Sequence, residues 1–467
     1  MTNILYDALF AGLAGRGTTL LRLADGSVLS GAAFHALLAQ AAGALRAAGV
    51  VKGDRVAAQV AKSPQALALY GATVAIGAVF LPLNTAYVAA EVDYFLTDAT
   101  PKLFVNDLTG VPLATLFGGP ADLTVEPCGP DDLAAILYTS GTTGRSKGAM
   151  LTHGNLLSNA EVLADLWRFT PADVLLHALP IFHTHGLFVA SNVSLLSGGQ
   201  MIFLPGFDLD TVLRLLPQAT TMMGVPTFYT RLLSDPRFDR ALTAHMRLFV
   251  SGSAPLLTET HRAFHDRTGH WILERYGMTE TNMNTSNPYD GERRAGTVGL
   301  PLPGVELRIV GGVIEVRGPN VFAGYWRMPE KTAEDLRAGG WFITGDLGQL
   351  DPDGYVQIVG RSKDLIITGG YNVYPKELEL LLDAVPGVTE SAVIGLPHPD
   401  LGEAVFAVLV GGNAEAALAA IAGDLARYKQ PKAAVLVADL PRNAMGKVQK
   451  NVLREQYKDW FAAKQGG

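Results

Sequence analysis

Hydrophobic and polar positions follow two alternating patterns along the first 300 residues. Residues 33–48 repeat apolar side chains at the helical spacing, whereas residues 174–178, 201–204, 222–225 and 248–251 are short apolar runs bounded by turn-forming residues. Such short continuous runs are typical of parallel strands that are buried on both faces. The pattern predicts an α/β domain in which these four strands share a sheet covered by helices.

Residues 66–90 carry no charge and could be mistaken for a membrane span. Gly71, Gly77, Pro82 and Asn84 interrupt this stretch. A buried helix over 64–77 followed by a strand over 78–83 explains it better. Further short strands are expected at 55–60 and 103–106.

The pattern changes near residue 297, where the chain becomes rich in glycine and in short strands. A smaller α+β region follows, with helices expected at 375–383 and 414–427 and strands at 390–396, 404–410 and 433–437. We therefore predict two domains, residues 1–361 and 364–467, joined at 361–364. The expected fold is a large N-terminal domain of parallel-sheet α/β subdomains with a small β-rich subdomain, and a small mobile α+β C-terminal domain.

Composition narrows the function classes. The 467 residues are 48% hydrophobic and 17% charged, with a net charge of −7 and no long run of one sign, so we expect neither a nucleic-acid surface nor a membrane partner. The single cysteine, Cys128, excludes a disulfide within the chain and fits a reducing, cytoplasmic location. We interpret Cys128 as incidental to function.

The strongest motif is Tyr138–Gly148, which reads YTSGTTGRSKG and follows an apolar run. Glycines allow the backbone to approach a polyphosphate, while hydroxyl and amide groups donate to its oxygens and Lys147 adds a positive charge. Ser146 stands where a Walker A loop requires glycine, so this is a different phosphate loop. The alternative, a flexible polar surface loop, would need no lysine.

This segment resembles the phosphate-binding motif of the adenylate-forming superfamily, which contains acyl-CoA synthetases, adenylation domains and luciferases. Five further segments match that superfamily in order: SGSAP (251–255), ERYGMTE (274–280), WFITGD (341–346), VGRSKD (359–364) and PRNAMGK (441–447). Singly, each charged residue in them would be read as a solvated surface charge. Their order along the chain overturns that reading.

The resemblance implies a role for each motif. Lys447 would bridge the attacking carboxylate and the α-phosphate, Glu280 would hold Mg²⁺ and Asp346 would bind the ribose hydroxyls; Thr279 and His183 are further catalytic candidates. The expected ATP-binding residues are Thr139, Ser140, Gly141, Thr142, Thr143, Gly144, Lys147, Ser253, Ala254, Pro255, Glu274, Arg275, Tyr276, Gly277, Met278, Thr279, Asp346 and Arg361.

A second step, attack of the coenzyme A thiol on the acyl-adenylate, is also implied. In the superfamily the small domain rotates between the steps at a hinge residue, to which Lys363 corresponds. Gly369, Gly370 and Tyr371 would then approach the pantetheine arm. A plain turn between a strand and a helix is the alternative for the two glycines.

The acid is indicated by a closer resemblance, to malonyl-CoA synthetases. The stretches ALPIFHTHGLFVASN, MGVPTFYTRLL and ERYGMTETNMNTSNPYDG are similar to that family. It implies malonate or a short 2-substituted malonate as substrate, with His183 in the wall of the acyl pocket. Arg294 is the first candidate for the distal carboxylate and Arg247 the second, since a guanidinium suits a carboxylate. For both arginines a surface position is the alternative.

Three other functions remain open at this stage: a carrier-loading adenylation enzyme, a non-catalytic ATP sensor and a luciferase-like oxygenase. Retention of Lys447, Glu280 and Asp346 argues against the sensor. The expected small-molecule partners are ATP, Mg²⁺, malonate and coenzyme A, and the oligomeric state is left open.

Overall fold

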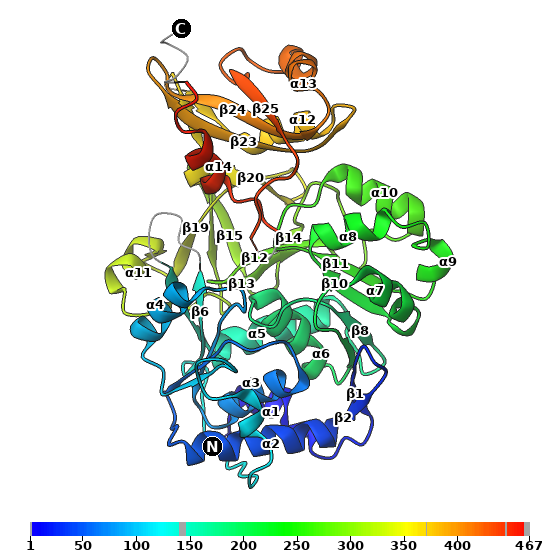
Figure 1. Cartoon of the computed structure of the whole chain (residues 1–467), viewed down its shortest axis with the longest axis vertical. Helices are drawn as coiled ribbons and strands as arrows, with labels where there is room; N and C mark the ends of the chain where they lie inside the picture. The colour runs from blue at the N-terminus through cyan, green and yellow to red at the C-terminus, as the bar shows by residue number, and fades with distance from the viewer. Residues whose placement is uncertain (1, 140–145, 370, 444–445, 462–467) are drawn as a thin grey trace. The chain divides into compact units, whose positions relative to one another are not determined.

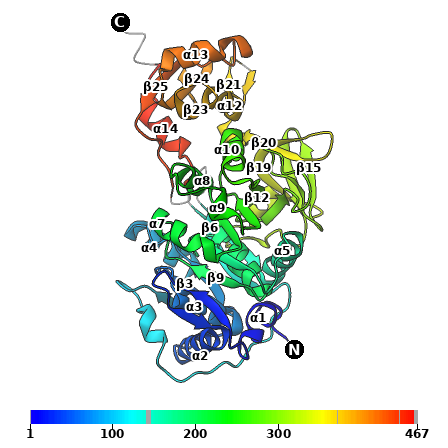
Figure 2. The same cartoon turned by 90° about the vertical axis from the view of Figure 1, so that its right-hand side faces the viewer.

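The computed structural model describes residues 2–139, 146–369, 371–443 and 446–461. These residues form two compact units: unit 1 comprises Met1–Leu307 and Val316–Phe342, and unit 2 comprises Arg308–Glu315 and Ile343–Gly467. Figures 1 and 2 show the elements of both units along the colour ramp.

The larger sheet of unit 1 contains the four predicted buried strands. Its order is β14-β13-β12-β11-β10-β8-β9-β1-β2, and β12, β11, β10, β8, β9 and β1 run parallel. The bounds are β1 Thr19–Arg22, β2 Val28–Ser30, β8 Val174–His177, β9 Gln200–Phe203, β10 Thr221–Gly224, β11 Leu248–Ser251, β12 Leu273–Met278, β13 Asn282–Ser286 and β14 Leu300–Pro301. Strands β10 and β11 are buried at every position, which confirms the interpretation of their apolar runs.

The second sheet of unit 1 carries the predicted phosphate loop. Its order is β17-β7-β6-β4-β3-β5, with a parallel half (β6, β4, β3, β5) and an antiparallel half (β17, β7, β6). The bounds are β3 Arg55–Ala58, β4 Val79–Pro82, β5 Leu103–Val105, β6 Leu133–Thr139, β7 Lys147–Thr152 and β17 Gly324–Tyr325.

Helices cover these sheets, and side chains at their N-termini set where they begin. Ser30 caps α2 and Ser63 caps α3, each accepting a backbone N–H three residues on. Helix α3 is buried from Ala66 to Ala75, which explains the uncharged stretch. The helices are α1 Ile4–Leu9, α2 Gly31–Ala47, α3 Pro64–Ala75, α4 Ala89–Ala99, α5 His153–Leu166, α6 Asn192–Leu196, α7 Leu209–Leu215, α8 Pro226–Leu233, α9 Arg240–Thr243, α10 Thr258–Thr268 and α11 Pro329–Asp335.

A five-stranded β-rich sheet follows, with the order β15-β16-β19-β18 and β20 beside β19. Its strands are β15 Glu306–Val310, β16 Val313–Arg317, β18 Leu336–Arg337, β19 Trp341–Leu350 and β20 Val356–Arg361. Gly311 and Gly312, with φ of 57° and 82°, form the two-residue turn between β15 and β16. Two successive positive φ values suit the tightest hairpin turn, and glycine adopts them without strain.

Unit 2 continues with a second five-stranded sheet, ordered β22-β21-β24-β23 with β25 parallel to β24. Apolar side chains fill both of its faces, one under α12 and α13 and the other under α14. The elements are β21 Ile366–Thr368, β22 Tyr371–Val373, α12 Pro375–Asp383, β23 Val388–His398, β24 Gly402–Gly411, α13 Ala414–Ile421, β25 Ala433–Val437 and α14 Lys450–Tyr457.

One predicted helix is too long. The helix expected at 414–427 ends at Ile421 and continues only as a 3-10 turn over Ala422–Asp424. Gly423 lies in that turn, where glycine favours leaving the helix.

The domain boundary predicted at residues 361–364 is not the point at which the chain divides into these two units. Residues 343–361, which include most of β19 and all of β20, are grouped with unit 2 by their contacts. A hinge at Lys363 remains a prediction.

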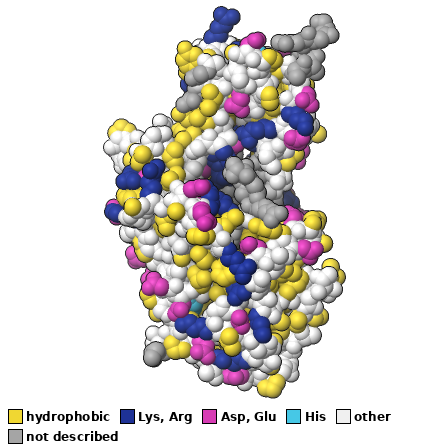
Figure 3. All heavy atoms as spheres, turned by 90° about the vertical axis from the view of Figure 1, so that its left-hand side faces the viewer, with side chains coloured by type: hydrophobic (Ala, Val, Ile, Leu, Met, Phe, Trp, Pro, Cys, Tyr) yellow, Lys and Arg dark blue, Asp and Glu magenta, His cyan; other side chains and the backbone are white. Residues whose placement is uncertain are grey.

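None of the helices in the described part of the chain combines the length and apolar character needed to cross a bilayer. On the face shown in Figure 3, lysine, arginine and acidic side chains are interspersed among apolar ones. This mixture differs from the clustered basic footprint of a nucleic-acid surface.

Candidate functional site

The phosphate loop connects two antiparallel strands. Thr139, the last residue of β6, pairs with Lys147, the first residue of β7. Five of the predicted phosphate-binding residues lie outside the described residues, namely Ser140, Gly141, Thr142, Thr143 and Gly144. A Cβ atom on Gly148 would lie 2.9 Å from Ile136 Cγ2, so a larger residue there would disturb the strand beneath the loop.

Lys147 lies in a group of charged and aromatic side chains from unit 1. Its ammonium nitrogen is 4.3 Å from the centre of the Tyr325 ring and 3.6 Å from Asp335 Oδ2. The Tyr325 hydroxyl donates to Glu280 Oε1 over 3.2 Å. Burial, followed by the charges of Glu280 and Asp335, raises the pKa of Tyr325, so its proton stays on as a donor.

Glu280 is 5% exposed and is the only predicted metal ligand. No group of three or more His, Cys, Asp or Glu side chains within the described ranges could form an all-protein metal site. A single carboxylate still fits Mg²⁺, which is commonly held by one or two carboxylates together with the phosphates of a substrate.

The predicted adenine turn begins where β11 ends. Ser253 has a φ of 70°, and its hydroxyl lies 3.2 Å from His185 Nδ1. Glu274 Oε1 accepts the backbone N–H of Leu256, which fixes the end of the turn. Ligands of α/β sheets bind at the carboxyl ends of parallel strands, and this turn lies at that edge.

Arg275 projects from β12 toward this turn. It is 3% exposed, and its guanidinium lies against Gly252, where a Cβ atom would be 2.4 Å from Arg275 Cζ. Burial lowers the pKa of Arg275 to about 9. The neighbouring residues Tyr276, Gly277 and Met278 complete β12 and Thr279 follows it, and their role in binding ATP remains a prediction.

The two histidines of FHTHG occupy different positions. His183 Nδ1 accepts the backbone N–H of His185 over 3.2 Å. His185 is 1% exposed and begins η3 (His185–Ser191), a π-helix, a rare form that often marks functional sites. Burial, followed by the charge of Arg275, holds the pKa of His185 well below its usual range, so the ring is neutral.

A buried network that sequence reasoning missed anchors this segment. The Lys62 ammonium donates to His177 Nδ1, His177 O and Leu179 O, each over 2.8 Å. His177 Nε2 lies 2.9 Å from Gly186 O, so the network connects the chain just before the FHTHG segment to the last residue of that segment. Lys62 is an isolated charge shortly before α3, and no motif marks it as functional.

The structure argues against Arg247 as a carboxylate receptor. Its guanidinium holds Asp173 over 2.6 and 2.9 Å and donates to Trp167 O over 2.9 Å. Arg247 also precedes β11, whereas the adenine turn follows β11, so the two lie at opposite edges of the sheet. The donors of Arg247 therefore stabilise the larger sheet at the amino ends of its strands.

Arg294 lies in the loop between β13 and β14. Its Nε donates to Glu292 Oε2 over 2.8 Å, and its backbone N–H donates to Asn287 Oδ1. A role in binding the distal carboxylate remains a prediction.

Four predicted residues of unit 2 converge. Asp346 pairs with Arg361 across β19 and β20, and Arg361 Nε lies 2.9 Å from Asp346 Oδ1. Lys447 interacts electrostatically with this pair and with Lys363. Asp346 is 3% exposed, which makes its pairing with a guanidinium necessary.

A tight hairpin presents Lys447. Gln449 N–H donates to Pro441 O over 2.7 Å, and the backbone of Lys447 is bonded to Asn443 in both directions over 3.0 Å. Burial lowers the pKa of Lys447 to about 8, and the charges of Arg361 and Lys363 add to this shift. Burial likewise lowers the pKa of Lys363 to about 8.

The predicted coenzyme A segment joins two antiparallel strands rather than a strand and a helix, and its role toward coenzyme A remains a prediction. Thr368 of β21 pairs with Tyr371 of β22, and Gly369 has a φ of 56°. Gly370 lies outside the described residues. Tyr371 is 60% exposed and stacks on Tyr428 with ring centres 4.7 Å apart.

Residues 16–326 match the family described as AMP-binding enzyme, and residues 377–447 match the AMP-binding enzyme C-terminal domain. The chain belongs to the AMP-binding enzyme family.

Three similar proteins show which members of the family this AMP-binding enzyme resembles. ATP-bound MatB from Rhodopseudomonas palustris is 55% identical with a TM-score of 0.95, covering 99% of this chain and 100% of that chain. A malonyl-CoA ligase solved with methylmalonyl-CoA and AMP is 37% identical with a TM-score of 0.70, covering 93% and 100%. The malonate–CoA ligase of Arabidopsis thaliana is 40% identical over 370 residues, covering 69% of this chain but only 61% of that ligase. The predicted α/β fold with a large N-terminal and a smaller C-terminal domain is confirmed.

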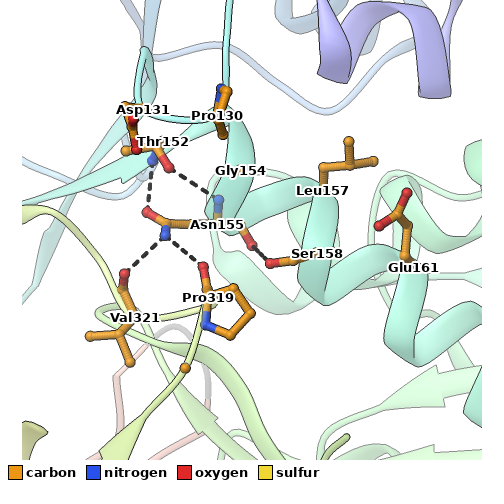
Figure 4. Close-up of a pocket in the computed structure, with 11 residues that line it drawn as sticks. Pro130, Asp131, Thr152, Gly154, Asn155, Leu157, Ser158, Glu161, Pro319 and Val321 are labelled. Atoms are coloured by element: carbon orange, nitrogen blue, oxygen red, sulfur yellow. Dashed lines mark hydrogen bonds between the residues drawn. The ribbon is translucent and has the colours of Figure 1, made fainter. Parts of the chain in front are cut away.

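A cavity of about 460 Å³ in this AMP-binding enzyme contains none of the predicted site residues (Figure 4). At its wall, Asn155 Nδ2 donates to Pro319 O over 2.8 Å and to Val321 O over 2.9 Å. Asn155 also completes the cap of α5 with Thr152. These groups satisfy one another, and the bonds hold the chain segment that leads to Tyr325.

Cys128 is buried, and burial raises the pKa of its thiol to about 11. A thiol in this state is a poor nucleophile, in agreement with its interpretation as incidental.

Proposed function

We propose that this chain is a malonyl-CoA synthetase. It would convert ATP, malonate and coenzyme A to malonyl-CoA, AMP and pyrophosphate through a malonyl-adenylate, with methylmalonate as a second substrate. The observation that carries the proposal is the similarity to ATP-bound MatB over 99% of this chain at 55% identity.

In the first step, a malonate oxygen would attack the α-phosphorus of ATP and pyrophosphate would leave. Both reactants are anions, so the reaction needs cations and in-line positioning. Lys147 would hold the outer phosphates, and Lys447 would sit between the malonate carboxylate and the α-phosphate. Mg²⁺, held by Glu280 and phosphate oxygens, would neutralise charge on the triphosphate.

Asp346 would accept the ribose hydroxyls and Arg361 would support it. The 2.9 Å ion pair between them orients the buried Asp346 carboxylate. The turn at Ser253, Ala254 and Pro255 would receive the adenine ring.

In the second step, the coenzyme A thiolate would attack the acyl carbonyl carbon and AMP would leave, while the thiol proton passes to solvent. Gly369 and Tyr371 would line the path of the pantetheine arm. Rotation at the hinge near Lys363 would exchange Lys447 for this loop. A cytoplasmic location is part of the proposal.

The test is pyrophosphate release by the wild type with ATP, Mg²⁺ and coenzyme A across acetate, propionate, malonate, methylmalonate, succinate, benzoate and octanoate. We expect malonate to have the highest kcat/KM. Preference for a monocarboxylate would overturn the proposed substrate and leave an acyl-CoA synthetase of another specificity. Comparison of coenzyme A with an acyl-carrier protein as acceptor separates the carrier-loading alternative.

A further inference from the structure

Helix α4 is bonded to the chain on both sides of the phosphate loop. On the incoming side, the Tyr138 hydroxyl near the end of β6 donates to the carboxylate of Asp98. On the returning side, the Tyr94 hydroxyl donates over 2.8 Å to the carbonyl oxygen of Ser146, the residue before β7. Burial, followed by the hydrogen bond to Asp98, raises the pKa of Tyr138, so its hydroxyl keeps the proton that it donates.

The ring of Tyr94 is fixed by its aromatic neighbours. Its centre lies 5.5 Å from that of Phe95 and 6.2 Å from that of Tyr138, and both pairs meet edge to face. Phe95 is buried and itself packs against Tyr138 with ring centres 4.5 Å apart. Edge-to-face pairs of this kind are a preferred aromatic geometry. The packed ring therefore holds the Tyr94 hydroxyl in one direction, toward Ser146.

The C-terminal end of α4 is also connected to β7, through Trp326. The carbonyl oxygen of Asp98 accepts from Trp326 Nε1 over 3.2 Å and from Arg327 Nη1 over 2.8 Å. The backbone N–H of Trp326 donates to Gly148 O over 2.7 Å. A cation at a helix C-terminus is favourable, so Arg327 also stabilises this end. The distance between α4 and β7 is thus set at a second point besides Tyr94.

The carbonyl that Tyr94 binds belongs to the peptide group between Ser146 and Lys147. Because a peptide group is planar, fixing its oxygen also fixes the backbone N–H of Lys147. The ammonium end of Lys147 is held separately, 4.3 Å from the centre of the Tyr325 ring and 3.6 Å from Asp335 Oδ2. Backbone and ammonium are therefore positioned by different elements, and α4 accounts for the backbone.

We propose that Tyr94 is a positioning residue that orients Lys147 for the outer phosphates of ATP. This inference rests on the proposed function, in which Lys147 binds those phosphates, and it adds a residue that lies in none of the six motifs. A preorganised group binds more tightly because less conformational freedom is lost on binding. Loss of the Tyr94 hydroxyl is therefore expected to weaken contacts to the β- and γ-phosphates and to spare contacts to the rest of the nucleotide.

The test compares the Kd of ATP with the Kd of AMP, which lacks the two outer phosphates, with Mg²⁺ present and no acid. In Tyr94→Phe, which keeps the ring, the Kd of ATP is expected to rise about fivefold, as for the loss of one neutral hydrogen bond. The Kd of AMP is expected to stay within about 1.5-fold of the wild type, because AMP does not reach Lys147. With saturating malonate and coenzyme A, the KM for ATP should rise while kcat changes by less than about twofold.

The matched control is Tyr87→Phe. It removes a hydroxyl from the same aromatic cluster, at a ring whose centre lies 5.0 Å from that of Phe95, and leaves the bond to Ser146 in place. Both nucleotide affinities are expected to equal those of the wild type. Tyr94→Leu removes the ring as well and is expected to raise the Kd of ATP more than Tyr94→Phe does. Thermal unfolding checks that each variant is folded.

An unchanged Kd of ATP in Tyr94→Phe would overturn the inference. An equal rise in the Kd of ATP and of AMP, or an equal effect of Tyr87→Phe, would do the same. A wild type that releases no pyrophosphate with any of the acids would instead overturn the proposed function. The two nucleotide affinities are measured without an acid, so they would still decide the inference in that case.

Discussion

Tyr325 links Lys147 to Glu280. The Lys147 ammonium lies 4.3 Å from the centre of the Tyr325 ring, and the hydroxyl of the same ring donates to Glu280 Oε1. The predicted phosphate-binding cation and the predicted metal ligand are thus positioned by one side chain. Tyr325 comes from β17, about 180 residues after Lys147 along the sequence.

Tyr325→Phe is expected to raise the Mg²⁺ concentration needed for half-maximal ATP–pyrophosphate exchange by about tenfold, because a hydrogen bond to a charged carboxylate is lost. The ring remains, so the position of Lys147 is kept. Tyr325→Leu removes the ring as well and should additionally raise the KM for ATP. An Mg²⁺ dependence of Tyr325→Phe equal to that of the wild type would show that the bond does not position Glu280.

Lys447 is expected to give the adenylation step a descending limb near pH 8. Its ammonium is charged below a pKa of about 8 and neutral above it, and only the charged form can bridge two anions. We expect kcat/KM for ATP–pyrophosphate exchange to fall as pH rises from 7 to 9.5.

The matched variant for this prediction is Lys447→Arg. Because a guanidinium stays protonated across this range, the variant should be slower than the wild type but lack the limb near pH 8. Wild-type exchange that stays constant up to pH 9.5 would contradict the assignment.

Lys62→Met is expected to weaken malonate binding indirectly, through the segment that the Lys62 network holds. The substitution leaves His177 Nδ1, His177 O and Leu179 O without their shared donor, which costs about 1–3 kcal/mol in the free energy of unfolding for an unsatisfied buried group. The KM for malonate should rise more than the KM for ATP, because the FHTHG segment is held by this network. Lys102→Met, at an exposed lysine, is the control; equal effects of the two variants would refute the prediction.

Asn155→Leu should lower the free energy of unfolding by about 2–3 kcal/mol, because the carbonyls of Pro319 and Val321 lose their donor and α5 loses part of its cap. Denaturant unfolding measures this change. Ser158→Ala, on the same helix (Figure 4), should change stability by less than about 0.5 kcal/mol. A loss in Ser158→Ala as large as that in Asn155→Leu would contradict this account.

Local patterns were sufficient to predict most of the fold. The four apolar runs became parallel strands because each is buried on both faces, and the uncharged stretch became α3 and β4. The helix after residue 414 was predicted too long, because its alanine-rich pattern continues beyond Ile421 while the chain turns at Gly423.

The candidate site was predicted as separate motifs, and its contacts were not. No local pattern indicates that Tyr325 lies against Lys147, or that Lys62 binds the carbonyls of residues 177 and 179. The two arginines chosen for the distal carboxylate were selected by residue type and nearness to motifs. Whether a guanidinium is already paired depends on tertiary contacts, and Arg247 shows this with Asp173.

The contact between Gly252 and Arg275 also makes the two positions mutationally interdependent. A side chain at residue 252 would collide with the guanidinium of Arg275. A shorter residue at position 275 would leave a cavity beside Gly252. Each substitution alone is therefore expected to lower the stability of the protein, whereas the two substitutions together can compensate for one another. Replacing this pair with another compatible pair therefore requires both positions to change together, or passes through a less stable intermediate that carries only one of the changes.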